Sequence, residues 1–184
     1  MKRAFDVSLS LLALILLSPI LAAATAAIAF EDGGPILFRQ TRLGLGGREF
    51  GMYKFRSMVR NAAAIGPYHT ASNDPRITTV GRLLRRASID ELPQLLNVLA
   101  GDMSLVGPRP DVPAQRSLYS DADWARRCSV RPGITGLAQA LLRSEATEAQ
   151  RLQLDLRYAR EHNLWLDLKI IGWTLTRIGG KGSN

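Results

Sequence analysis

Residues Val7–Phe30 read VSLSLLALILLSPILAAATAAIAF, 24 consecutive positions without a charged side chain. A straight helix of that length would extend about 36 Å, enough to cross the hydrocarbon core of a bilayer. Ser18-Pro19 lies near the midpoint, where proline removes a backbone donor and clashes with the carbonyl four residues earlier. We therefore expect the helix to break or bend there, with the hydroxyls of Ser8, Ser10 and Ser18 available to the freed carbonyls.

Three topologies compete for this stretch. A cleaved signal peptide would begin at Lys2 and Arg3 and end at the small residues 27–29, but Asp6 interrupts its basic start. A single spanning helix would leave basic residues on both sides of the membrane, which the positive-inside rule disfavours. On the C-terminal side these are Arg39, Arg42, Arg48, Lys54, Arg56 and Arg60. A re-entrant hairpin, with both ends on the cytoplasmic face, agrees with the central break and with the charges, and we favour it.

Length and composition limit the rest of the chain. We expect a membrane element at 1–30 and one globular domain at 31–184, acting as a single functional unit. The formal charge of +8 indicates anionic partners, which nucleic acid, anionic lipid headgroups and phosphorylated substrates all satisfy. Cys128 is the only cysteine, which excludes an intramolecular disulfide and a cysteine-based metal site. His69 and His162 are far apart in sequence and show no metal-ligand spacing.

Short elements are expected in the first half of the domain. Pro35–Arg42 and Glu49–Arg56 read as two strands, with a turn at Gly44–Gly47 between them. Val80–Arg86 and Glu91–Ala100 read as helices, and Gly101 is a suitable C-cap for the second.

The second half reads as longer helices. Residues 61–76, which precede the predicted helix Val80–Arg86, are polar and predict a surface loop. In the second half, Glu145–Glu161 predicts a charged helix. Leu164–Ile178 has apolar residues at helical spacing but is too short and too charged to span a membrane. With Trp165 and Trp173 it either lies in the membrane interface or packs on the core. The expected fold is α+β and mostly helical: a re-entrant helix-break-helix packed on a small globular domain with amphipathic interfacial helices and a short β-hairpin.

Asp90-Glu91 is the candidate chemical centre. Ser88-x-x-Glu91 has the form of a capping box, but a helix capped at Ser88 would place Pro93 at its fifth position, where an N–H should be bonded. A helix that starts at Asp90 places Pro93 in the first turn, where proline is tolerated. A helix N-terminus favours phosphate and the ionised form of Asp90, which keeps this carboxylate available as a nucleophile or Mg²⁺ ligand.

Basic residues near this pair are candidates for phosphate binding. Arg82, Arg85 and Arg86 precede it and could hold phosphate oxygens. Arg109 stands between two prolines in Gly107–Pro110, and a restricted backbone suits oriented recognition of phosphate. From the residues alone, a surface arginine in a loop remains an equal alternative for Arg109.

Four motifs in this order resemble those of the bacterial sugar transferase family, the monotopic phosphoglycosyl transferases, in its small catalytic-domain-only type. They are Tyr53–Met58 (YKFRSM), Ser88–Leu99 (SIDELPQLLNVL), Gly101–Pro110 (GDMSLVGPRP) and Arg131–Gly136 (RPGITG). The resemblance runs from Lys2 to about Ile178. It implies a helix-break-helix that enters and leaves the bacterial inner membrane on the cytoplasmic face, broken at Ser18-Pro19.

The resemblance also implies a reaction. Asp90 would attack the β-phosphate of a UDP-sugar, release UMP and carry the phosphosugar until polyprenyl (undecaprenyl) phosphate takes it. Mg²⁺ would be bound by Asp90 and Glu91 and offset phosphate charge, while Glu91 serves as metal ligand or as an acid/base group. Lys54 and Arg85 match basic positions of the family and would bind phosphates. The product would be the first membrane-bound intermediate of polysaccharide or glycoconjugate synthesis.

The chain departs from the family pattern after Gly136. Gln139 and Arg143 keep their places as substrate-binding candidates. The family's Trp is replaced by Leu137, and its Asn-Gly before Arg143 is missing. The resemblance therefore implies no particular sugar. The oligomeric state is left open, a homo-oligomer included.

A competing hypothesis is a membrane-anchored basic protein that binds nucleic acid or acidic lipid without catalysis. It explains the charge and the N-terminal stretch, but neither the proline-flanked Arg109 nor the Asp-Glu pair. We expect a UDP-sugar, a polyprenyl phosphate and inner-membrane lipids as partners, and no nucleic acid.

Overall fold

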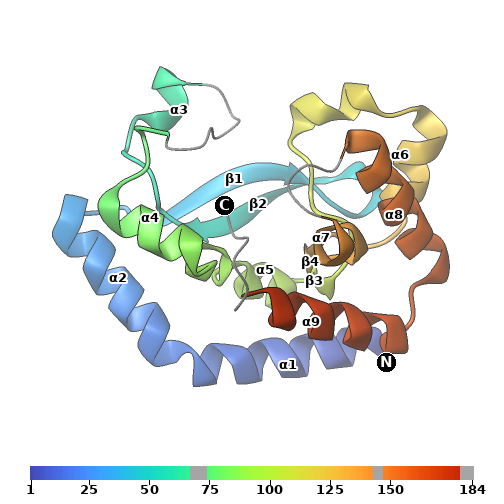
Figure 1. Cartoon of the computed structure of the whole chain (residues 1–184), viewed down its shortest axis with the longest axis horizontal. Coiled ribbons are helices and arrows are strands. Elements are labelled where there is room, and N and C mark those ends of the chain that lie inside the picture. The colour runs from blue at the N-terminus through green and yellow to red at the C-terminus, as the bar shows by residue number, and fades with distance from the viewer. Residues whose placement is uncertain (67–73, 143–146, 179–184) are drawn as a thin grey trace.

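The computed structural model describes residues 1–66, 74–142 and 147–178, and the statements below concern these residues. The chain begins with two helices, α1 (Lys2–Leu16) and α2 (Ser18–Asp32), which meet at a bend of 62° (Figure 1). The Ser18 hydroxyl donates to the Ile15 carbonyl at 2.8 Å, the carbonyl that Pro19 leaves without its N–H donor. The predicted break at Ser18-Pro19 is therefore confirmed.

Neither helix is by itself long and apolar enough to cross a membrane. By length and composition the bent pair passes that test as a unit. A continuous span is not observed, because the break divides the apolar stretch into two helices of 15 residues each.

The predicted β-hairpin is present. Strand β1 (Leu37–Leu43) pairs antiparallel with β2 (Glu49–Phe55), and the 3-10 turn η1 (Leu45–Gly47) joins them. Positive φ angles at Gly46 and Gly47 allow this tight reversal. Side chains directly opposite each other share a face, so Gln40, Arg42 and Lys54 lie on one face around the buried Met52.

Short elements follow the hairpin. Helix α3 (Ala62–Ile65) lies within the segment predicted as a surface loop. That prediction is wrong at both ends of the segment, because α3 forms there and the side chains of Asp74 and Arg76 are buried as an ion pair at 2.7 Å. Residues 67–73 lie outside the described residues. Helix α4 (Thr79–Arg86) confirms the predicted basic helix, and the Thr78 hydroxyl caps it by accepting from the Gly81 N–H at 2.9 Å.

A second, two-stranded sheet brings the two proline-containing stretches together. Strand β3 (Ser104–Val106) follows α5 (Gln94–Ala100) and pairs in parallel with β4 (Gly133–Thr135). The backbones approach so closely that a Cβ on Gly107 would lie 2.2 Å from the Arg131 carbonyl oxygen. In the sequence, the 3-10 helix η3 (Pro113–Leu118) and α6 (Asp121–Arg127) lie between β3 and β4.

The last helices complete the main core. These are α7 (Leu137–Leu141), α8 (Glu148–Glu161) and α9 (Leu164–Ile178). The predicted helix 145–161 is confirmed from Glu148, whereas residues 145 and 146 lie outside the described residues. The core cluster that the three helices share with β3 comprises Val106, Leu137, Ala140, Tyr158 and Ile170. Helix α9 thus packs on the core with one face, while Trp165, 67% exposed, and Leu175, 64% exposed, leave an apolar face uncovered.

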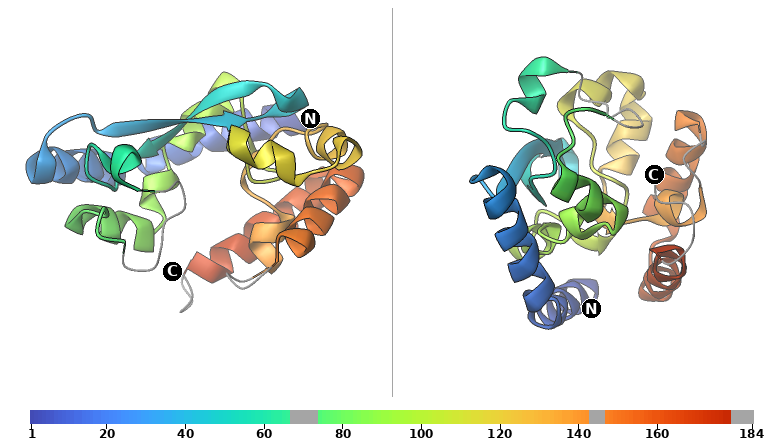
Figure 2. Two further views of the ribbon diagram at one scale, coloured as in Figure 1. Left: turned by 90° about the horizontal axis from the view of Figure 1, so that it is seen from above. Right: turned by 60° about the vertical axis from the view of Figure 1, so that its left-hand side comes forward.

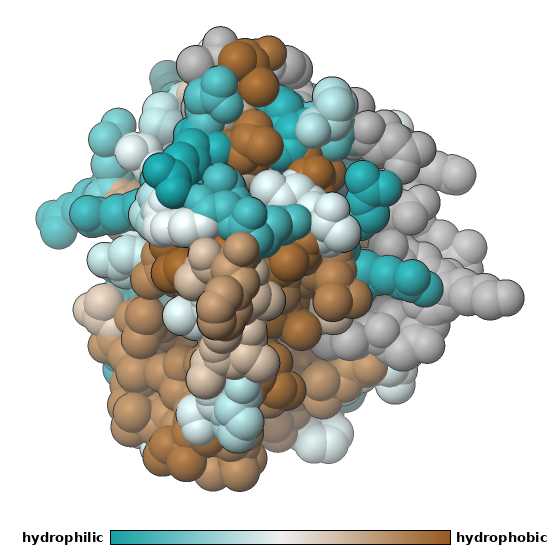
Figure 3. Space-filling view, turned by 90° about the vertical axis from the view of Figure 1, so that its left-hand side faces the viewer, coloured by the Kyte–Doolittle hydropathy of each residue, from teal (hydrophilic) through white to brown (hydrophobic). Residues whose placement is uncertain are grey.

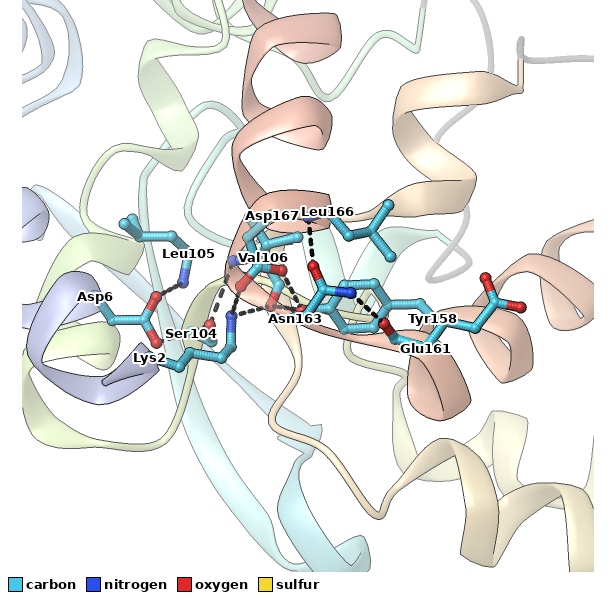
Figure 4. Close-up of polar contacts among 10 residues, drawn as sticks. All are labelled: Lys2, Asp6, Ser104, Leu105, Val106, Tyr158, Glu161, Asn163, Leu166 and Asp167. Atoms are coloured by element: carbon cyan, nitrogen blue, oxygen red, sulfur yellow. Dashed lines mark hydrogen bonds and ion pairs between the residues drawn. The ribbon is translucent and has the colours of Figure 1, made fainter.

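Buried polar contacts join α1 to the domain (Figure 4). The Lys2 ammonium pairs at 2.6 Å with Asp167 of α9, whose side chain is fully buried. The Asp6 carboxylate accepts from the Ser104 hydroxyl at 2.9 Å and from the Leu105 N–H at 3.2 Å. Arg3 donates to the carbonyls of the last turn of α5. The N-terminal pair is therefore part of the folded core at its first turns and not a separate appendage.

The elements are arranged around α4 and α5. The bent pair lies on one side of them and α8 with α9 on the other, as the right-hand view of Figure 2 shows. The expected mostly helical α+β fold with a short hairpin is confirmed, and the hairpin crosses above α5 (Figure 1).

Candidate active site

The Asp-Glu pair lies in a single 3-10 turn, η2 (Ile89–Glu91), between α4 and α5. Ser88 before it is left-handed, with φ of 55°, which ends α4 and reverses the chain toward the hairpin. Ser88 makes no side-chain cap, so the rejection of the capping box is confirmed. The prediction that the helix starts at Asp90 or Glu91 is wrong: α5 begins at Gln94, because Pro93 serves as its N-cap. The predicted Gly101 C-cap is present, with φ of 95°.

Two cations converge on one oxygen of Glu91. Lys54 Nζ lies 2.7 Å and Arg109 Nη2 lies 2.9 Å from Oε1. Burial alone would raise the pKa of Glu91, but the charges and hydrogen bonds of Arg109 and Lys54 outweigh it and lower this pKa to about 2. Glu91 is therefore ionised at neutral pH.

Asp90 has the opposite environment. Its side chain is only 7% exposed, and within the described parts of the chain its carboxylate makes no hydrogen bond or ion pair. Burial raises the pKa of Asp90 above its usual range, the charge of Lys54 opposes this, and the neighbouring Glu91 adds to it. The expectation of an ionised form stabilised by a helix start is thus wrong. The protein keeps a poorly solvated, unpartnered carboxylate beside cations.

Arg85 is the one of the three upstream arginines that turns toward the pair. Its Nε donates to the Ser57 hydroxyl at 2.8 Å, and its charge lowers the pKa of Asp90. Arg82 and Arg86 are exposed on α4. Sequence reasoning missed Ser57 as the residue that orients Arg85.

Arg42 was not among the predicted site residues. Its guanidinium is half-buried and donates to the Gln40 side-chain oxygen and to the Pro110 carbonyl, next to Arg109. Burial and the charge of Arg109 lower the pKa of Arg42 to about 10. The hairpin register gives a signal that could have found it, since Arg42 and Lys54 share a strand face.

Arg127 supports the Arg109 loop from behind. Its Nη2 donates to the Arg109 carbonyl at 2.6 Å, and the same buried guanidinium pairs with Asp111 and with Asp155, the latter at 3.0 Å. These partners come from two segments that are distant from Arg127 in sequence, residues 109–111 and Asp155 in α8, so no local sequence pattern marks Arg127.

Gln139 is not joined to the Asp-Glu pair in the part of the chain that the structure describes. Gln139 lies in α7 and donates to the Ile134 carbonyl at 3.1 Å, and within the described residues no hydrogen bond or ion pair links it to Asp90 or Glu91. Arg143 lies outside the described residues, as does His69.

The carboxylates of Asp90 and Glu91 fit a magnesium ion only if water and substrate phosphate supply its other ligands. Among the residues that the structure describes, no group of three or more His, Cys, Asp or Glu side chains could enclose a metal. Asp90 and Glu91 offer two carboxylates, and Mg²⁺ typically takes one or two carboxylates and completes its shell with water and substrate phosphate. The unpartnered oxygens of Asp90 agree with such a ligand.

A buried carboxylate without a partner, beside lysine and arginine side chains, agrees with an enzyme that handles phosphorylated substrates. The chain belongs to the bacterial sugar transferase family, whose family model matches residues 1–181.

Relatives of this chain are named as transferases or as exopolysaccharide proteins. It is 48% identical over 177 residues to the UDP-glucose:undecaprenyl-phosphate glucose-1-phosphate transferase of Caulobacter vibrioides, covering 92% of this chain and 66% of the relative. It is 40% identical to the UDP-N-acetylgalactosamine-undecaprenyl-phosphate N-acetylgalactosaminephosphotransferase of Aeromonas hydrophila, covering 96% of this chain and 43% of the relative. It is 43% identical to the exopolysaccharide production protein PSS of Rhizobium leguminosarum bv. phaseoli, covering 99% of this chain and 98% of the relative.

The chain thus spans less than two thirds of the length of the first two relatives and nearly all of the third. Membership of a transferase family speaks against the hypothesis of a basic protein without catalysis. The two named nucleotide sugars differ, so the relatives do not agree on one sugar.

Proposed function

We propose that this chain is a phosphoglycosyl transferase that moves a sugar phosphate from a UDP-sugar to polyprenyl (undecaprenyl) phosphate and releases UMP. The observation that carries the proposal is the unpartnered, buried carboxylate of Asp90 beside Lys54, Arg85 and Arg109. The names of the relatives add the substrate classes.

Asp90 is the nucleophile in this reaction. One carboxylate oxygen attacks the β-phosphorus of the UDP-sugar, and the bond from that phosphorus to the bridging oxygen breaks, so that UMP leaves with the bond's electrons. In the second half, an oxygen of the lipid phosphate attacks the same phosphorus and returns the electron pair to Asp90. The product is a sugar joined to the lipid through a diphosphate. Low solvation of Asp90 strengthens it as a nucleophile once it is ionised.

The surrounding cations hold the phosphates. Lys54 and Arg109 are fixed in place by Glu91, and Arg85 is fixed by Ser57. With a pKa of about 2, Glu91 carries no proton to donate at neutral pH. We therefore assign Glu91 to orienting Lys54 and Arg109 and to metal binding, in preference to general acid catalysis.

Asp90 and Glu91 are also the residues that would hold Mg²⁺. A bound Mg²⁺ supplies positive charge that offsets the charge of the diphosphate.

The proposed setting is the cytoplasmic face of the bacterial inner membrane, with the bent pair as a re-entrant element. Both ends of this pair contact the same domain: Lys2 pairs with Asp167, and Arg56 pairs at 3.2 Å with Asp32 at the end of α2. A helix that crossed the bilayer would separate its two ends by the membrane thickness.

An uncovered apolar surface supports this setting. On the bent pair it comprises Leu11, Leu12, Ile15, Leu16, Ile20 and Phe30. Figure 3 shows apolar side chains filling the lower part of the molecule below a hydrophilic upper part. Trp165 and Trp173 of α9, both exposed, add the aromatic side chains that favour a membrane interface.

The test uses the purified full chain in detergent with undecaprenyl phosphate and a panel of UDP-sugars. We expect UMP release with at least one UDP-sugar. With a sugar labelled in the hexose and no lipid acceptor, label should remain on the wild-type protein and be absent from Asp90→Asn. Absence of UMP release from the whole panel would refute the function, and label retained by Asp90→Asn would refute Asp90 as the attachment site.

A further inference from the structure

Arg42 is a half-buried cation without a counter-ion among the described residues. Its guanidinium forms no ion pair there and is held by two neutral acceptors. Nε and Nη2 donate to Gln40 Oε1 at 3.2 and 2.7 Å, and Nη1 donates to the Pro110 carbonyl at 2.9 Å. The side chain is therefore oriented by neutral acceptors, and the carboxylates of Asp111 and Glu91 act on its charge without forming an ion pair with it.

Keeping this charge is unfavourable for the folded protein by itself. Burial and the nearby Arg109 both disfavour the charged form, as the pKa of about 10 reflects. A purely structural tie between the hairpin and the Pro110 loop needs a donor but no charge. An arginine at such a position therefore points to an anion that is absent when the protein is free.

The position is on the face of the hairpin that looks toward the site. Arg42 and Lys54 project from the same face, and Lys54 contacts Glu91. The Pro110 carbonyl that holds Arg42 belongs to the residue after Arg109, which contacts Glu91 as well. Arg42 thus stands beside the two cations already assigned to phosphate binding.

The charges of the site are unequal without substrate. Four cations, Arg42, Lys54, Arg85 and Arg109, face Asp90 and Glu91, because the third nearby carboxylate, Asp111, is paired with Arg127. With Asp111 assigned to Arg127, a net of two positive charges is left. A diphosphate diester such as that of a UDP-sugar carries two negative charges.

We propose that Arg42 binds a phosphate oxygen of a substrate of the transfer reaction. This inference rests on the proposed function. The phosphate belongs either to the nucleotide diphosphate or to the lipid acceptor, and the two share the chemistry that a guanidinium recognises.

The experiment compares Arg42→Gln and Arg42→Lys with the matched control Arg39→Gln. Arg39 lies on the same strand but on the opposite face, against Gly51 and the Tyr53 ring, so its replacement removes one charge outside the site. For each variant we measure KM for the UDP-sugar, KM for undecaprenyl phosphate, and the rise in melting temperature that UDP causes.

Arg42→Gln should raise the KM for one of the two substrates about 10-fold or more, the effect of losing a hydrogen bond to a charged group. Arg42→Lys, which keeps the charge but not the fork of donors, should recover part of this loss. A rise confined to the UDP-sugar, with loss of the UDP-induced thermal shift, assigns Arg42 to the nucleotide. A rise confined to undecaprenyl phosphate assigns it to the acceptor. Without ligand, Arg42→Gln should melt no lower than Arg39→Gln, because it removes a charge that burial and Arg109 disfavour.

Two results would overturn the inference while the wild-type protein still releases UMP. One is an Arg42→Gln variant with both KM values and the UDP response equal to those of Arg39→Gln. The other is a variant that melts several degrees lower, with kcat reduced and KM unchanged, which indicates a structural role. A wild-type protein that releases no UMP would instead refute the proposed function itself.

Discussion

Two groups of charged residues lie on either side of the Arg109 loop, one partly exposed and one buried, and their excess charges have opposite signs. The first is the site, where Arg42, Lys54, Arg85 and Arg109 outnumber Asp90 and Glu91. The second, the Arg127 cluster, consists of Arg127 between Asp111 and Asp155 and so has one carboxylate in excess.

The difference follows from the proton chemistry of the excess groups. In the Arg127 cluster burial raises the pKa of Asp155 to about 6, so a proton can remove the excess charge near neutral pH. The arginines of the site keep their protons at neutral pH, since even Arg42 retains a pKa of about 10. An excess of guanidinium is balanced only by an anion from outside, which is why we propose substrate binding for the first group and a structural role for the second.

The largest expected effect is at Asp90. Asp90→Asn keeps the shape of the side chain but removes the nucleophile, and turnover should fall by about 10³-fold or more, as for other nucleophile replacements. The assay is UMP release in the presence of undecaprenyl phosphate. Asp121→Asn, at a fully exposed carboxylate, is the control and should retain wild-type turnover. Wild-type turnover in Asp90→Asn would contradict the assignment.

Arg127→Met tests the structural cluster. It leaves the buried carboxylates of Asp111 and Asp155 unpaired, and the free energy of unfolding should fall by about 3–5 kcal/mol. Urea unfolding in detergent at neutral pH measures the change. Arg126→Met, one residue earlier and exposed, should change it by less than about 0.5 kcal/mol. Equal stabilities of the two variants would remove the distinction between cluster and site.

The pH dependence of stability should report Asp155. Its folded-state pKa of about 6 exceeds the ordinary value of 3.8, so the folded state binds the proton more tightly than the unfolded state. This contribution is fully present below about pH 4 and is lost as the pH rises through about 6, by roughly 2–3 kcal/mol. Urea unfolding between these pH values measures it. Asp155→Asn should abolish this slope, and an unchanged slope would show that another group titrates.

The smallest effect is expected at Ser57. Ser57→Ala removes the neutral acceptor that orients Arg85, without removing any charge. The net value of such a hydrogen bond is about 0.5–1.5 kcal/mol, so KM for the UDP-sugar should rise roughly 2–10-fold while kcat changes little. Ser117→Ala, at an exposed hydroxyl, serves as the control. A KM equal to that of the control would mean that Arg85 needs no orientation by Ser57.

Sequence patterns predicted the elements that are determined by residues close together in the chain. The proline break, the hairpin with its glycine turn, α4 and α9 all follow from such patterns, and α9 was predicted to the residue. The β3–β4 pair could not be predicted, because three-residue strands contain too little alternation to detect. The predicted start of α5 was wrong because residues 89–91 form a separate 3-10 turn and Pro93 is the N-cap of α5.

The same division applies to the site. Lys54, Arg85, Asp90, Glu91 and Arg109 were all identified from motifs and do lie together. Arg42 and Arg127 were missed, because their roles depend on contacts with the loop at residues 109–110 and not on their neighbours in sequence. Burial also reversed the expected pKa direction of Asp90, which depends on the complete tertiary environment.

The hydrogen bonds from Arg3 to the last carbonyls of α5 connect the N-terminal helix α1 to the region of the Asp90–Glu91 turn. Helix α5 directly follows the turn that carries Asp90 and Glu91, so the contacts of Arg3 join α1 to the element next to this pair. In the proposed topology, the depth to which α1 sinks therefore sets the height of Asp90 above the plane of lipid phosphates. In that topology, an acceptor phosphate would react at the membrane surface without leaving the bilayer.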